Sequence, residues 1–248
     1  MDIHKPKLWH GLGEFLKEYA IIVIGVLTAL AAEQAVEAVH EHRAAQDSRE
    51  AIYREIRQNL SFMKGRLMTQ ACVGKRLDEI GSLLAKAGEG PMASPPKWVG
   101  QPSTWFMASQ RWEVATGSGH ASLFDADEQD RLANVYVITT HFADAEHSEQ
   151  AAWAQLRGLE TWTGPLGNAG RVQFMSALQS ARYALWDIRA SIGLAFDRAK
   201  ALGIANSDAR TMGGGHTIPH AVCLPMDMPR DTALALLART SPPWGQPK

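Results

Sequence analysis

Tyr19–Ala32 reads Tyr-Ala-Ile-Ile-Val-Ile-Gly-Val-Leu-Thr-Ala-Leu-Ala-Ala, a stretch without a charge and the most apolar part of the chain. Its fourteen residues form a helix of about 21 Å, shorter than the roughly 30 Å hydrocarbon core of a bilayer. Apolar side chains continue on both flanks, and a helix over Phe15–Val39 is about 37 Å long, enough to cross a bilayer with some tilt. We therefore predict a short N-terminal segment, residues 1–18, followed by a transmembrane helix, residues 19–39.

Two other interpretations of this segment stay open. A short apolar run ending in Ala29-Leu30-Ala31 is also typical of a cleaved signal peptide, although Glu14 and Glu18 before the run are not. The same length also fits the buried core helix of a soluble protein. A retained single-pass anchor is the interpretation that the extended flanks favour.

The lysines around the apolar segment indicate its orientation. Three lysines, Lys5, Lys7 and Lys17, precede it. The first Lys or Arg after it is Arg43. Cytoplasmic flanks of membrane helices carry an excess of Lys and Arg. The bias predicts a cytoplasmic N-terminus and an exported C-terminal domain.

The composition allows a folded domain and excludes some functions. The chain has 248 residues, of which 46% are hydrophobic, so the part after the anchor can bury a core. Its net charge of −1 gives no electrostatic basis for binding nucleic acid. Cys72 and Cys223 either form one disulfide in an oxidising compartment or remain two buried thiols. They are too far apart for a C-x-x-C redox motif.

Residues 40–205 have the pattern of a helical bundle. Apolar side chains recur there at spacings of three and four residues, as in an amphipathic helix, at Ile52, Ile56, Leu60, Met63, Leu67, Leu77, Ile80 and Leu84. No proline interrupts Leu8 to Gly90. We expect the membrane helix to continue as one rod toward Ala87, loosened at its glycines.

Further helices are expected downstream, at residues 103–116, 125–163 and 168–202. Ser103 or Thr104 is the expected N-cap of the first, and Asp125 with Glu128 resembles a capping box at the start of the second. Residues 206–248 are rich in Gly and Pro and contain one expected short helix, residues 229–239. No segment alternates as a strand does. The predicted fold is all-α, with an N-terminal transmembrane helix continuing into an antiparallel helical bundle.

Gly25, Ala29 and Glu33 follow one another at four-residue spacing and share one helix face. Small residues permit close helix–helix approach, and a carboxylate near the membrane boundary is costly unless it meets a partner or water. These three residues are a candidate seam with a second membrane helix. The alternative is that the apolar span ends at Ala32 and Glu33 meets water.

Candidate metal ligands and nucleophiles are incomplete. Glu37-x-x-His40 and Asp144-x-x-His147 have the carboxylate–histidine spacing of di-iron bundles, but the further glutamates that such sites need are missing. His216-x-x-x-His220 with Cys223 is too few ligands for a firm zinc assignment. Ser61-x-x-Lys64 lacks the companion motifs of serine acyl-enzymes. We predict no catalytic, cofactor-binding or metal site.

Tryptophans offer a different kind of site. The candidates to line an apolar ligand pocket inside the bundle are Trp105, Trp112, Trp153 and Trp186. An aromatic stripe at helical spacing more commonly packs in a core. Core packing is therefore the favoured interpretation and a ligand pocket the alternative.

Two blocks of the sequence resemble a known group of proteins. Phe15-Leu16-Lys17-Glu18 followed by Ile21-Ile22-Val23-Ile24-Gly25-Val26-Leu27 is similar to the anchor of uncharacterised bacterial single-pass membrane proteins. Trp112-Glu113, Thr116-Gly117 and Leu123 resemble a second block of the same proteins. The resemblance implies membrane anchoring and a helical domain of unknown function, and it carries over no activity. Together with the lysine bias, it leads us to expect a bacterial inner-membrane location with the C-terminal domain in the periplasm.

The function that these observations predict is non-enzymatic. We expect a membrane-anchored helical protein that acts through protein–protein contacts, as an accessory subunit or scaffold of a membrane complex or as a homo-oligomer. Its expected partners are the lipid bilayer and another membrane protein or a second copy, with no cofactor. The alternatives are a periplasmic sensor-like module for a small apolar ligand and, third, a metal-dependent enzyme.

Overall fold

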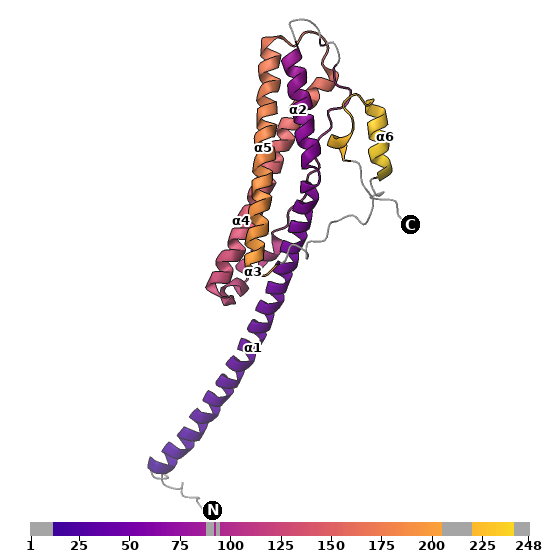
Figure 1. Ribbon diagram of the computed structural model, residues 1–248. Coiled ribbons are helices and arrows are strands. Elements are labelled where there is room, and N and C mark those ends of the chain that lie inside the picture. The colour runs from indigo at the N-terminus through magenta and orange to yellow at the C-terminus, as the bar shows by residue number, and fades with distance from the viewer. Residues whose placement is uncertain (1–11, 88–91, 93–94, 205–219, 241–248) are drawn as a thin grey trace, which may run out of the picture.

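The computed structural model describes residues 12–87, 92, 95–204 and 220–240, and within these ranges the chain is all-α (Figure 1). The six α-helices are α1 (Leu12–Leu67), α2 (Gln70–Lys86), α3 (Gln110–Gly117), α4 (Ala126–Leu156), α5 (Gly167–Ala201) and α6 (Arg230–Thr240). Short 3₁₀ turns precede α4, follow it, and precede α6. The described part contains no strand, so the predicted fold class is confirmed.

The first half of α1 projects from the rest of the molecule as a single rod (Figure 1). Its second half packs in the bundle, where Ala45 is the first fully buried residue along the helix. α2 continues upward from the end of α1, and α4 and α5 run antiparallel to each other beside them (Figure 1). The bundle therefore stands at one end of a long exposed helix.

The predicted apolar stripe is the core of the bundle. Around α1, Ile52, Ile56 and Met63 pack with residues of α4 and α5 such as Phe142 and Ile188. Around α2, a second cluster joins the buried side chains Leu77, Ile80, Leu84, Trp153 and Leu178. Leu67 is the exception, because it lies at the end of α1 and is exposed.

The expected continuous rod toward Ala87 is wrong. α1 ends at Leu67 and α2 begins at Gln70. At the break, the N–H of Met68 bonds to the carbonyl of Gly65 and the N–H of Thr69 to that of Arg66, which tightens the last turn. The Thr69 hydroxyl donates to the Arg66 carbonyl at 2.9 Å and competes with a helical partner.

The helix expected over residues 103–116 begins only at Gln110, so Ser103 and Thr104 are not its caps. Residues 101–109 are extended because side chains of α1 and α4 bind their backbone. Asn59 donates to the carbonyl of Ala108 at 2.8 Å and accepts from its N–H at 3.0 Å. Gln150 donates to the carbonyl of Pro102. These bonds replace those that a helix would make.

Most later helix boundaries follow the sequence, but α4 ends at Leu156, seven residues before the expected end at 163, and a 3₁₀ turn covers Arg157–Thr161. Asp125 caps α4, with its carboxylate accepting from the N–H of Asp127 at 2.9 Å. Glu128 does not complete a capping box, because it accepts hydrogen bonds from Arg49 and Tyr53 of α1 instead. α5 differs by one residue at each end from the expected 168–202, and α6 by one from the expected 229–239.

Candidate functional site

The first half of α1 carries large apolar side chains on all sides. Val23 is half-buried, and the exposed ones include Phe15, Leu16, Tyr19, Ile21, Ile22, Ile24, Val26, Leu27 and Leu30. This is the one helix in the described part that is long and apolar enough to cross a membrane, and none of its most apolar window is buried in the protein. A core helix of a soluble domain would bury that surface. The surface is therefore available to a different apolar environment.

The predicted seam residues lie on this exposed part of α1. Gly25, Ala29 and Glu33 are all exposed, and a Cβ added at Gly25 meets no atom within 4 Å. Within the described chain nothing covers this face. A larger side chain at Gly25 would fit the isolated protein, so its tolerance depends on what packs there.

A fully buried ion pair lies at the top of α1. Arg66 and Glu149 of α4 are both 0% exposed, and Nη2 of Arg66 donates to the two carboxylate oxygens of Glu149 at 2.7 and 2.9 Å. Nη1 donates to the Thr69 hydroxyl at 3.0 Å. Burial raises the pKa of Glu149, and attraction to Arg66 opposes the rise. The pair fixes the end of α1 against the middle of α4.

Glu146, one turn before Glu149, is a second buried carboxylate at the same place. Its Oε2 accepts from the backbone N–H of Trp105 at 3.2 Å, whereas Oε1 has no partner among the described residues. Burial raises the pKa of Glu146 to about 7, and proximity to Glu149 adds to the rise. Buried polar atoms of Arg66, Gln70 and Trp153 also lack a described partner.

His220 adds a titratable group near this cluster. Its Nδ1 lies 3.4 Å from the hydroxyl of Ser103. Burial lowers the pKa of His220, and the positive charge of Arg66 lowers it further.

We call Arg66, Glu146, Glu149 and Thr69 the ionic joint, because they connect α1, α4 and the start of α2.

A second anchoring site lies beside α2, where the C-terminal segment docks. Cys72 and Cys223 form a disulfide, which decides between the two alternatives for these cysteines. The buried Arg76 donates to the backbone carbonyls of Trp98, Val99 and Leu224, and to Glu79. Two chain segments, residues 98–99 and 223–224, are thereby fastened to one face of α2.

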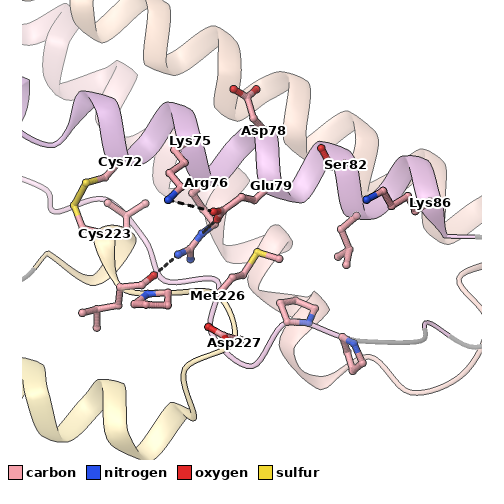
Figure 2. A pocket seen from close by; sticks show the side chains of 16 residues that line it. Cys72, Lys75, Arg76, Asp78, Glu79, Ser82, Lys86, Cys223, Met226 and Asp227 are labelled. Carbon is pink, nitrogen blue, oxygen red and sulfur yellow. Dashed lines mark hydrogen bonds and ion pairs between the residues drawn. A yellow bond between two sulfur atoms is a disulfide. The ribbon is translucent and has the colours of Figure 1, made fainter.

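An open groove of about 1110 Å³ runs along the same face of α2. Figure 2 shows the disulfide at one end of the groove and Ser82 and Lys86 toward the other. Its opposite wall holds Pro95, Pro96 and Met226. Both signs of charge line it, so its surface favours no single class of ion.

The four predicted pocket tryptophans do not come together. Trp105 stacks on Phe62 with ring centroids 5.3 Å apart, and Trp112 stacks on Tyr136 at 5.7 Å. Trp153 is fully buried in the cluster around α2. Trp186 is exposed beside Tyr183, so it does not face the bundle interior. Within the described chain they line no common cavity.

The candidate metal ligands are also separate. The described residues contain no group of three or more His, Cys, Asp or Glu side chains placed to hold a metal ion. Cys223 is in the disulfide, and His216 lies outside the described residues. His147 is exposed and bonds to the carbonyl of Ala143 on its own helix.

Comparisons with known proteins place the chain in no family. No protein-family model matches it, and neither the curated proteins nor the solved structures include a significant match.

Proposed function

We propose that this chain is a single-pass, membrane-anchored, non-enzymatic protein whose helical bundle acts through contacts with another membrane protein or with a second copy. The first half of α1 is the anchor, and the bundle is the periplasmic part of a bacterial inner-membrane protein. The N-terminus is cytoplasmic. The likeness of its anchor to those of uncharacterised single-pass membrane proteins remains a prediction.

One observation carries the anchoring. α1 is a single helix whose first half exposes most of its large apolar side chains and whose second half supplies core residues such as Ile52 and Ile56. Removing apolar surface from water gains roughly 25 cal/mol of free energy per Å². Insertion of the first half of α1 into a bilayer would therefore be strongly favourable. The second half then transmits the position of that anchor to the bundle.

The disulfide supports the orientation. Disulfides such as Cys72–Cys223 persist in oxidising compartments and are rare in the cytosol. Both cysteines lie in the bundle region, after the anchor. The lysine bias before the anchor favours the same orientation independently.

The outer face of α5 supports action through protein contacts. Val172, Tyr183, Trp186 and Leu194 are exposed. At 100° per residue they lie within about 80° of one another around the helix, which makes one apolar stripe along α5. Tyr183 and Trp186 contact each other, with ring centroids 5.8 Å apart, whereas the exposed Ser176 and Gln179 lie between Val172 and Tyr183. Clustered exposed apolar side chains are typical of interaction sites. We call these four residues the α5 stripe.

Affinity purification of the C-terminally tagged full chain from detergent-solubilised membranes, with mass spectrometry and native gels, tests the proposal. We expect either a stoichiometric foreign protein or a homo-oligomer. Two double variants distinguish the contributions of the two surfaces. Tyr183→Ala with Trp186→Ala alters the α5 stripe, and Gly25→Leu with Glu33→Leu alters the membrane seam. Phe106→Ala, which removes a 93% exposed ring elsewhere, is the matched control. A monomer without partner, unchanged by both pairs, would refute the proposal.

A further inference from the structure

Glu146 lies where three parts of the fold meet. It belongs to α4, it is 3% exposed, and it faces the end of α1 and the extended residues 101–109. Its Oε2 holds the backbone N–H of Trp105, and the ring of Trp105 stacks on Phe62 of α1. Glu146 is therefore a direct contact between α4 and the segment that lies against α1.

The charges around Glu146 do not balance when it is ionised. Arg66 is the cation acting on both carboxylates, and its Nη2 bonds only to Glu149. Glu146 receives one bond, from a neutral backbone N–H, and its buried Oε1 receives none from the described residues. An ionised carboxylate buried in this way is costly, because burial removes it from bulk solvent and no second donor among the described residues reaches it.

Apart from Arg66, which is shared with Glu149, the charged groups described on the neighbouring elements pair elsewhere. On α5, Arg182 pairs with Asp78 and Asp187 with His141, both at the exposed surface. The chain leading to the 3₁₀ turn before α6 contributes His220, whose lowered pKa favours its neutral form. On α4 itself, Glu149 is a like charge that disfavours ionisation of Glu146.

We propose that Glu146 is a proton-binding site of the ionic joint, loaded in weakly acidic solution and emptied in weakly alkaline solution. In the emptied state the uncompensated carboxylate favours conformations in which water reaches it. Water reaches Oε1 when residues 101–109 lift from α4. The proton thus controls how firmly this segment and the end of α1 are held together.

The direction of the pH effect follows from the pKa of Glu146, which burial raises from 4.5 to about 7 in the folded protein. A carboxyl group whose pKa is higher in the folded state than in the unfolded chain stabilises the fold. Its full contribution is present when the pH is below the pKa of the unfolded chain. That stabilisation is lost as the pH rises through the folded value. The effect is therefore confined to about pH 5 to 8. It does not depend on whether α1 crosses a membrane.

Thermal unfolding of the full chain in detergent micelles, followed by circular dichroism from pH 5 to 8, tests the proposal. We expect the melting temperature of the wild type to fall by roughly 5 °C over this range. Glu146→Gln should lose most of that dependence. Glu55→Gln is the matched control, since Glu55 is also buried but both its oxygens accept hydrogen bonds, from Tyr136 and the N–H of Arg111. Equal pH dependence in wild type and Glu146→Gln would overturn the proposal.

Infrared difference spectra of the wild type between pH 8 and pH 5 give a second measurement. It does not depend on whether a variant folds. We expect the carbonyl band of a protonated, buried carboxylic acid to appear with a midpoint near neutral pH. Partial labelling with carboxyl-¹³C glutamate distinguishes it from aspartate bands. A spectrum without a glutamic acid band titrating in this range would overturn the proposal as well.

Discussion

Arg66 and Glu149 are a costly pair to bury, and their value to the fold lies in position. The two residues are 83 positions apart in sequence, on α1 and α4, and meet through two hydrogen bonds from one nitrogen of Arg66. Replacing such a pair by apolar residues is commonly neutral, whereas removing one partner leaves an unpaired buried charge. The pair therefore specifies how α1 meets α4 more than it adds stability.

Arg66→Met should destabilise the protein strongly, by about 3–5 kcal/mol, because Glu149 is then buried without a cation. The double variant Arg66→Met with Glu149→Leu should recover more than half of that loss. Urea or guanidinium unfolding in a single detergent, followed by circular dichroism, measures both. If the double variant were as unstable as the sum of the two single variants, the pair would not be coupled.

The sequence contains a signal for the ionic joint, but a search for the spacing of apolar residues alone overlooks it. Phe142, Glu146, Glu149 and Trp153 follow one another at spacings of four, three and four, so the two glutamates lie on the buried face of α4. Charged residues inside an apolar stripe point to a buried polar partner. Which cation that partner is depends on the packing of distant helices, and the sequence pattern does not contain it.

Gly100 is the residue at which a small substitution should have the clearest local effect. Its φ is +70°, and an added Cβ would lie 2.5 Å from the carbonyl oxygen of Ala221, which accepts the indole N–H of Trp98. Gly100→Ala should cost about 3 kcal/mol, from left-handed strain and the forced displacement of the C-terminal segment.

Gly119→Ala is the control for that substitution. Gly119 has a φ of +82° but open space around the added Cβ, so its variant carries the backbone strain alone. We expect a loss of about 1 kcal/mol for it. Equal losses for the two variants, measured by the same unfolding curves, would mean that the contact with Ala221 contributes nothing.

At the scale of elements, the sequence predicted α5 and α6 to within one residue at each end but missed the break after Leu67 and the start of α3. α5 follows from its own stripe and from Gly203, whose φ of +78° ends it, so local pattern is sufficient there. Residues 103–109 are extended because Asn59 and Glu146, far away in sequence, bind their backbone. The break after Leu67 likewise depends on Thr69 and on packing at the ionic joint.

The disulfide should stabilise the C-terminal segment, which α2 also holds through Arg76. Cys72 and Cys223 are separated by 151 residues, so the chain-entropy contribution is at most about 5 kcal/mol. Reduction of the wild type by dithiothreitol should lower the free energy of unfolding. Cys72→Ser with Cys223→Ser should match the reduced wild type and not respond to the reductant. An unchanged free energy on reduction would show that the other contacts suffice.

At the scale of the whole molecule, the anchor and the bundle are separated by an exposed helical spacer. From Val39, where the predicted transmembrane helix ends, to Ala45, where burial begins, a helix rises about 9 Å. If α1 crosses the membrane as proposed, this spacer separates the bundle from the hydrocarbon core. The fold class was predictable from the apolar pattern, whereas the anchor stays a prediction and a partner has no sequence signature.

Protease treatment of intact spheroplasts that express the full chain with a C-terminal tag tests the central claim most directly. If α1 spans the membrane with the bundle outside, added protease removes the tag and leaves a membrane-bound fragment that contains the first half of α1. Sealed cytoplasmic markers must stay intact in the same sample. A tag that survives until the cells are lysed, or a chain recovered in the soluble fraction, would contradict the account.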